Sequence, residues 1–160
     1  MAVMPSLTFP DRFELPAREE MEQFVSLLQG YLRSLGRWTD VAYTAANFMA
    51  NGGTWTVGRN DQVTYQYKVQ NQTMNLNAYL DTTTVVGTPS LLYLAIPGGY
   101  VAARTVQCSV PFFDNGVDAP AYARVLAGGT VVEIGRMDGA ALTASTNLTY
   151  VRCMMEFEVQ

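Results

Sequence analysis

The chain has 160 residues, of which 49% are hydrophobic and only 15% are charged, so it is long enough to form one domain with its own core. It contains no histidine, which excludes Ser-His-Asp and Cys-His catalysis, histidine metal sites and histidine pH switches. Its formal net charge of −4 provides no basic footprint for nucleic acid.

The first 15 residues are predicted to form an extended arm, because three prolines at and near this stretch disfavour helices and central strands. Phe9 and Phe13 favour docking of the arm rather than free solvation. Docking on a neighbouring subunit or partner protein and docking on the chain's own domain both remain open. The arm has no basic start followed by an apolar block, so we expect no secretory signal. The absence of an 18-residue apolar stretch argues against membrane insertion.

Residues 16–36 are predicted to form a helix for oligomerisation or docking. Pro16 suits the first helical position and Gly36 is a natural stop. The apolar residues after Ala17 continue a 4-3-4-3-4 spacing, which is typical of an a/d seam. The residues assigned to oligomerisation are Met21, Phe24, Leu28, Tyr31 and Leu35. A bundle between subunits and packing on the chain's own sheet both explain this stripe.

Residues 37–53 are expected to connect the helix to the next domain, although Trp38 and Phe48 make this stretch too apolar for a free linker. From Thr54 onward, apolar and polar residues alternate, which indicates strands separated by glycine-rich turns. The predicted strands lie at 63–69, 74–80, 91–96, 106–110, 121–126, 131–134 and 151–159. The fold class is therefore mainly β, with an antiparallel β-sandwich or jelly roll over residues 54–160.

The two cysteines, Cys108 and Cys153, both fall within strand-like runs. A bridge between them is possible, but two reduced and buried thiols are favoured.

Candidate chemistry is sparse. Asp114 and Asp118 flank an Asn-Gly turn that resembles a calcium loop, but a polar loop tip explains them better. Glu156 and Glu158 share a strand face, where a solvated surface is favoured over a glycosidase pair. Nucleophile, phosphate-loop and zinc motifs are absent. We therefore expect no enzyme, no cofactor and no metal site.

Exposed tyrosines offer the best candidates for ligand or receptor binding. Tyr79 shares the polar face of its predicted strand with Asn75 and Asn77, and Tyr100 follows a Pro-Gly-Gly turn. Tyrosines in strands are more often core or sheet residues, so both readings remain open.

Residues 54–159 contain a series of strand and turn patterns that together resemble a known class of domain. The patterns are Trp55-Thr56-Val57, Val63-Thr64-Tyr65, Met74-Asn75-Leu76-Asn77, Val86-Gly87-Thr88-Pro89, the run from Leu92 to Gly99, Gly129-Thr130 and Phe157-Glu158-Val159. They resemble the C-terminal heads of bacteriophage fibres and related virion proteins, which are similar to the trimeric jelly rolls of the tumour-necrosis-factor and complement-head class.

The resemblance implies a homotrimer that acts as a non-enzymatic structural or adhesion protein of a virion, assembled in the host cytoplasm. Its arm would contact other virion proteins, and its sandwich would contact a receptor, with a surface glycan as one candidate. The recognition loops would be 58–62, 97–102 and 112–119. Two alternatives remain open: a stand-alone lectin-like carbohydrate-binding module, and a jelly roll that assembles into capsids or tubes.

Overall fold

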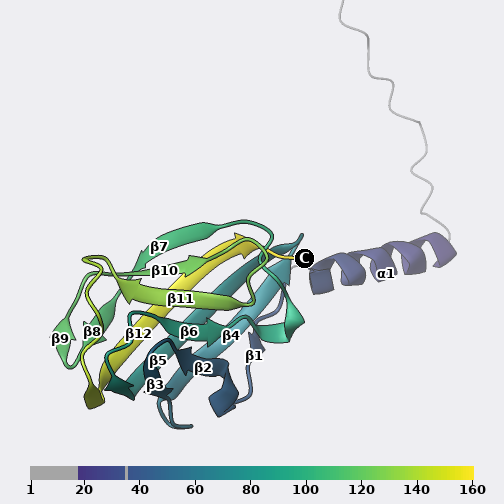
Figure 1. The fold of residues 1–160 in the computed structure, drawn as a ribbon. Coiled ribbons are helices and arrows are strands. Elements are labelled where there is room, and N and C mark those ends of the chain that lie inside the picture. Colours follow the sequence, from purple (N-terminus) through teal and green to yellow (C-terminus); the bar gives the residue numbers. More distant parts are fainter. Residues whose placement is uncertain (1–17, 35) are drawn as a thin grey trace, which may run out of the picture. The chain divides into compact units, whose positions relative to one another are not determined.

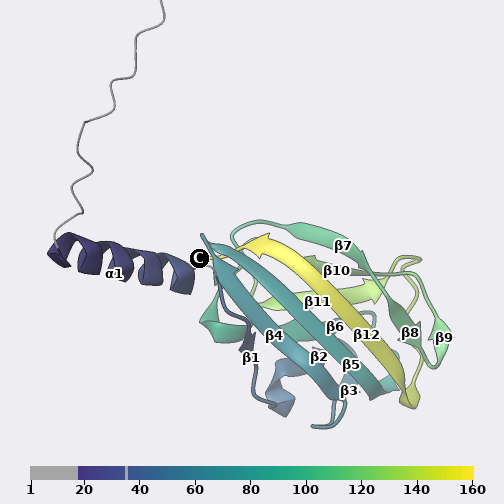
Figure 2. The same cartoon turned by 180° about the vertical axis from the view of Figure 1, so that it is seen from behind.

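The computed structural model describes residues 18–34 and 36–160 of the chain, which fall into two compact units, a helix and a sandwich (Figures 1 and 2). Side chains are described at residues 20–29 of the helix and throughout the sandwich. The predicted arm, residues 1–15, lies outside the described residues, as do positions 16, 17 and 35.

Helix α1 spans Arg18–Ser34, which confirms the predicted helix over its described part. Every described side chain of α1 is exposed. The exposed fractions of the predicted seam residues are 50% for Met21, 61% for Phe24 and 44% for Leu28. The side chain of Tyr31 and the whole of Leu35 lie outside the described residues. Leu27, which belongs to the wider apolar stripe, is 74% exposed.

The second unit is the predicted antiparallel β-sandwich, and in the described part of the chain it consists of a seven-stranded and a five-stranded sheet. The larger sheet contains β1 Thr39–Asp40, β3 Gly53–Thr56, β4 Gln62–Gln70, β5 Thr73–Gly87, β8 Phe112–Asp114, β9 Val117–Asp118 and β12 Ser145–Glu158. The smaller sheet contains β2 Phe48–Ala50, β6 Leu92–Ala95, β7 Val106–Val110, β10 Ala121–Val125 and β11 Val131–Arg136. Two short 3₁₀ helices, η1 Ala45–Asn47 and η2 Pro97–Gly99, lie between strands.

The larger sheet has the order β1-β4-β5-β12-β8-β9, and β3 pairs with the far end of β5. The smaller sheet has the order β2-β6-β11-β10-β7. The chain passes repeatedly from one sheet to the other, so several pairs of neighbouring strands come from distant parts of the sequence (Figure 1). Strand β12 is the clearest case, because it lies between β5 and β8.

The expected connector, residues 37–53, belongs to the sandwich instead of linking it to the helix. Strand β1 pairs with β4 in the larger sheet, and β2 pairs with β6 in the smaller one. The cause is apolar burial: Phe48 is only 5% exposed and packs edge-on against Trp55, with ring centroids 5.6 Å apart. The sandwich therefore begins well before Thr54.

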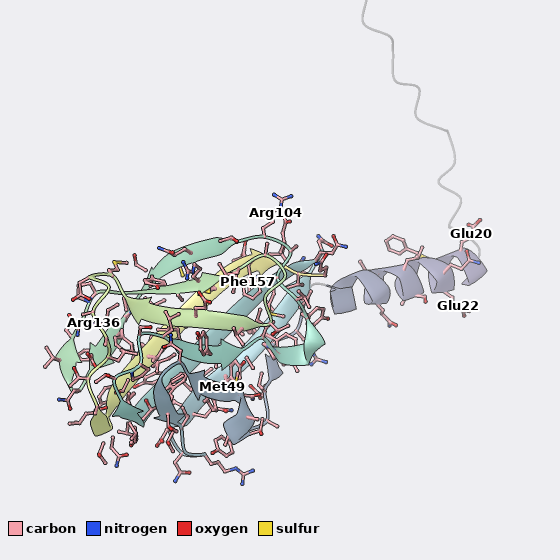
Figure 3. The ribbon with its side chains drawn as sticks, viewed as in Figure 1. Glu20, Glu22, Met49, Arg104, Arg136 and Phe157 are labelled. Carbon is pink, nitrogen blue, oxygen red and sulfur yellow. The ribbon has the colours of Figure 1, made fainter. Side chains whose placement is uncertain are left out.

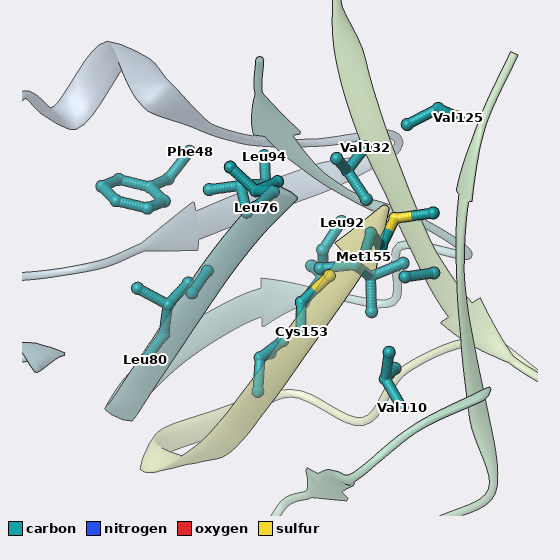
Figure 4. Close-up of a cluster of buried hydrophobic side chains, with 14 of the residues drawn as sticks. Phe48, Leu76, Leu80, Leu92, Leu94, Val110, Val125, Val132, Cys153 and Met155 are labelled. Atoms are coloured by element: carbon teal, nitrogen blue, oxygen red, sulfur yellow. The ribbon is translucent and has the colours of Figure 1, made fainter. Parts of the chain in front are cut away.

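Alternating side chains of both sheets fill the space between them (Figure 4). On β12, Val151, Cys153, Met155 and Phe157 are buried, whereas the residues between them are exposed. This is the alternation that the sequence predicted.

Trp55 and Thr83 connect three strands of the larger sheet through buried hydrogen bonds. The indole N–H of Trp55 donates to Thr83 at 2.9 Å, and the Thr83 hydroxyl donates to the carbonyl of Thr149 at 2.9 Å. Thr83 follows Thr82, whose positive φ of 52° marks a break in the regular strand. The β5–β12 pairing shifts register nearby, between Thr149 and Val151. Beyond this irregularity β5 continues to Gly87, past the strand end predicted at residue 80, and pairs there with β3.

Both cysteines are free. Cys153 is completely buried, and Cys108 donates weakly to the carbonyl of Met154, with 3.8 Å between sulfur and oxygen. Burial raises the pKa of Cys153 from 9.0 to about 12, and the nearby thiol of Cys108 adds to this effect. Burial also raises the pKa of Cys108 and that of Tyr65, whose hydroxyl donates to the carbonyl of Ala95.

We expect the sandwich to lose stability steeply in alkali. The unfolded Cys153 thiol ionises near pH 9, whereas the folded thiol keeps its proton to about pH 12. Between these values the unfolded state binds fewer protons, so the free energy of unfolding falls by up to about 1.4 kcal/mol per pH unit. Urea unfolding between pH 8 and 11 measures this slope, and Cys153→Ala should flatten it by about that amount. Equal slopes in the two proteins would contradict the assignment.

Candidate functional site

The outer face of the larger sheet carries three of the four predicted binding residues. Along β5, Asn75, Asn77 and Tyr79 point away from the core, because the residues between them are buried. Across the sheet, Tyr79 pairs with Arg152, and Asn77 pairs with Met154. The prediction that Tyr79 shares a polar face with the two asparagines is therefore confirmed.

Tyr100, the fourth predicted residue, lies elsewhere. It follows η2 and packs against Tyr67, with ring centroids 6.3 Å apart. Both tyrosines are partly buried against the hydrophobic core. Tyr67 lies two residues after the buried Tyr65 on β4, so its side chain points to the inner side of the larger sheet, and Tyr100 packs there too. Tyr79 lies on the outer side of the same sheet. The structure therefore does not bring Tyr100 and Tyr79 together.

A pocket of about 310 Å³ opens on the outer face where β5, β12 and β8 meet. Its lining residues are Tyr79, Pro111, Phe113, Tyr150, Val151 and Arg152. We call it the Arg152 pocket.

Cross-strand pairing assembles the walls of the Arg152 pocket. Tyr150 pairs with Phe113 across the β12–β8 ladder, and their rings meet edge to face at a centroid distance of 5.7 Å. The Arg152 guanidinium carbon lies 4.3 Å from the centroid of the Tyr79 ring, in cation–π geometry. The backbone N–H of Arg152 donates to the carbonyl of Pro111 at 3.1 Å. The pocket thus combines three aromatic rings with one cation.

The acidic turn considered for calcium has a different role. Asp114 is only 3% exposed, and its carboxylate pairs with Arg136 at 2.8 Å. It also accepts hydrogen bonds from the backbone N–H and the hydroxyl of Thr143. Asp118, by contrast, is exposed. The expectation of a polar loop tip is therefore wrong for Asp114, because its charge is buried and paired across the sandwich.

Arg136 also binds Asp138, with 2.6 Å between nitrogen and oxygen. The hydrogen bond from Arg136 lowers the pKa of Asp138 from 3.8 to about 2, and the backbone N–H of Ala140 contributes to this shift. Arg136 is therefore a bridge between two carboxylates near one end of the sandwich (Figure 3). This arrangement ties β8 to the turn that follows β11.

Glu156 and Glu158 are exposed on β12, as the alternation predicted. Glu158 pairs with Arg104 at 2.9 Å, at the exposed position seen in Figure 3. A shallow pocket of about 210 Å³ lies beside Glu156, lined by residues that include Trp38 and Met154. It has one carboxylate in its lining, so the geometry does not provide the pair of facing carboxylates that a glycosidase needs.

No known protein family, curated protein or solved structure matches this chain. No helix in the described part of the chain is long and apolar enough to cross a membrane. Within residues 18–34 and 36–160, no three Asp, Glu, Cys or His side chains come together as a metal site would require.

Sequence reasoning identified Tyr79 but missed its partners in the pocket. The alternation of β12 placed Arg152 on the outer face, and Phe113 fell within a predicted recognition loop. The missing information was the strand order β5-β12-β8 and its register, which bring these residues together. Register depends on long-range pairing that a single sequence does not reveal.

Proposed function

We propose that this chain is a non-enzymatic structural and adhesion protein of a virion, which forms a homotrimer and acts by surface attachment or receptor contact. In this proposal, α1 joins the subunits and the sandwich presents the contact surface. The resemblance of residues 54–159 to phage fibre heads supports it, and so does the sandwich architecture.

The observation that carries the proposal is the exposed apolar stripe of α1. Met21, Phe24 and Leu28 are each at least 44% exposed, and they follow heptad spacing. Exposed apolar stripes of this kind mark interaction sites, because burying them against a partner helix is favourable. Identical helices from symmetry-related subunits provide such a partner without any other protein.

A stand-alone carbohydrate-binding module is the second candidate, and the Arg152 pocket favours it. A concave site with aromatic walls and few polar groups suits a small ligand. The two candidates differ in what they require of α1. A virion head of this type needs subunit association, whereas a soluble module does not.

The test is the molar mass of the protein in solution, measured by light scattering during size-exclusion chromatography. We expect about 53 kDa, which is three times the chain mass of 17.6 kDa. Phe24→Glu places a charge in the seam and should yield a species of 17.6 kDa. Ser26→Glu is the matched control, because Ser26 occupies the heptad position opposite the seam, and this variant should remain trimeric.

A monomeric full-length protein would overturn the trimer and make the stand-alone module the better explanation. A trimer that survives both Phe24→Glu and Leu28→Glu would show that α1 does not join the subunits. The tryptophan fluorescence spectra of all variants should match, since Trp38 and Trp55 lie in the sandwich and the substitutions lie outside it.

A further inference from the structure

We propose that the Arg152 pocket binds an acidic sugar, with the Arg152 guanidinium holding the sugar's carboxylate and the surrounding rings holding its apolar face. The inference deepens the proposed adhesion function by naming a ligand class. It stands on the geometry of the pocket, so it applies equally to a trimer or a monomer.

The Arg152 guanidinium has no hydrogen-bond partner among residues 18–34 and 36–160. Its side chain makes no ion pair or hydrogen bond with any residue in the described part of the chain. Three arginines of the sandwich, in contrast, form ion pairs: Arg104, Arg124 and Arg136. Arg152 has a ring contact with Tyr79 instead, so its N–H groups remain available for a carboxylate.

The Arg152 guanidinium is also preorganised for a ligand. A guanidinium that rests 4.3 Å from a ring centroid has lost part of its rotational freedom before any ligand arrives. The planar fork of Arg matches a carboxylate in bidentate geometry, and this pairing is stronger than a neutral hydrogen bond. The pocket therefore holds its cation in place without neutralising it.

The aromatic walls of the Arg152 pocket suit a sugar ring in shape and chemistry. Phe113 and Tyr150 stand edge to face, and Phe113 is 41% exposed although it is a large apolar side chain. Exposed rings contribute apolar contact area, and they suit a ligand with one apolar face and one polar rim. A sugar ring has both. A volume of about 310 Å³ lies at the low end for ligand pockets, so we expect contact with a single sugar residue.

The charges around the Arg152 pocket favour an acidic sugar over a polyanion such as nucleic acid. Nucleic acid would need several cations, but Glu156 and Glu158 follow Arg152 on the same exposed strand face. Asp81 accepts a hydrogen bond from the Tyr79 hydroxyl at 3.4 Å, but it does not line the pocket. A ligand with one localised negative charge fits better than a polyanion.

The experiment is a binding measurement with the full-length protein. The probes are oligosaccharides that end in N-acetylneuraminic, glucuronic or galacturonic acid, each paired with the same oligosaccharide lacking the acidic residue. Isothermal titration calorimetry or saturation-transfer NMR reports binding. We expect at least one acidic probe to bind with a Kd between about 10 μM and 1 mM, and its neutral counterpart to bind at least about tenfold more weakly.

Variants then assign the binding to the pocket. Arg152→Gln keeps a polar side chain with hydrogen-bond donors but removes the charge, and should weaken acidic-sugar binding at least tenfold. Tyr79→Ala should weaken it to a similar degree, because it removes the ring that supports the guanidinium. Arg104→Gln is the matched control: this arginine is also exposed on the sandwich but does not line the pocket, so binding should be unchanged.

Three results would overturn the proposal. One is that no acidic probe binds with a Kd of about 1 mM or tighter. Another is equal binding of acidic and neutral probes, which would indicate a neutral-glycan site. The third is acidic-sugar binding that Arg152→Gln leaves intact. The molar-mass test of α1 is independent, so failure of one proposal is distinguishable from failure of the other.

Discussion

Replacing Asp114 by alanine should destabilise the sandwich by about 3 kcal/mol. The substitution removes the acceptor for the backbone N–H and hydroxyl of Thr143, and it removes one of the two carboxylates that bind Arg136. The loss should stay below that of a fully orphaned buried charge, because Arg136 keeps its bond to Asp138. Urea unfolding followed by tryptophan fluorescence measures the change.

Asp118→Ala is the matched control for this experiment. Asp118 lies on the same hairpin but is exposed, so its removal should change the free energy of unfolding by less than about 0.5 kcal/mol. Similar losses in the two variants would mean that Asp114 does not have the structural role that its burial indicates.

Phe112→Ala should cost about 3–5 kcal/mol, the range for removing a large ring from a packed core. Phe112 is 1% exposed and is among the largest fully buried side chains of the described residues. Its chain neighbour Phe113 points to the opposite face of the sheet and is 41% exposed. Thermal and urea unfolding of Phe112→Ala and Phe113→Ala therefore compare the loss of a buried ring with the loss of an exposed ring at adjacent positions.

Phe113→Ala should cost only about 1 kcal/mol, the value of its edge-to-face contact with Tyr150. It should instead weaken acidic-sugar binding, because Phe113 forms a wall of the Arg152 pocket. If Phe113→Ala destabilised the protein as much as Phe112→Ala, the assignment of the two rings to opposite faces of β8 would be wrong.

Much of the sandwich could be predicted because local sequence determines which side chains can face the core. The alternation on β12 and on the first half of β5 required only a period of two, and burial follows it residue by residue. The Asn115-Gly116 turn could also be predicted from the sequence. Both residues have positive φ, at 51° and 76°, which asparagine and glycine adopt most easily.

The parts that could not be predicted depend on contacts between distant residues. Residues 37–53 contain strands of only two or three residues, too short to show a period. The burial of Asp114 depends on Arg136, which lies 22 positions along the chain. The Arg152 pocket depends on the pairing of β12 with both β5 and β8. Each of these features follows from the arrangement of the sheets, and none has a local signal.

The central position of β12 has a consequence for how the sandwich is made in the cell. Strands β4 and β5 leave the ribosome long before β12, yet β12 fills the place beside β5 in the finished sheet. Until residues 145–158 are synthesised, one edge of β5 remains unpaired over much of its length, and an open edge invites association between nascent chains. Closure must also bring together residues that lie 60 to 85 positions apart, which predicts slow folding, in milliseconds to seconds.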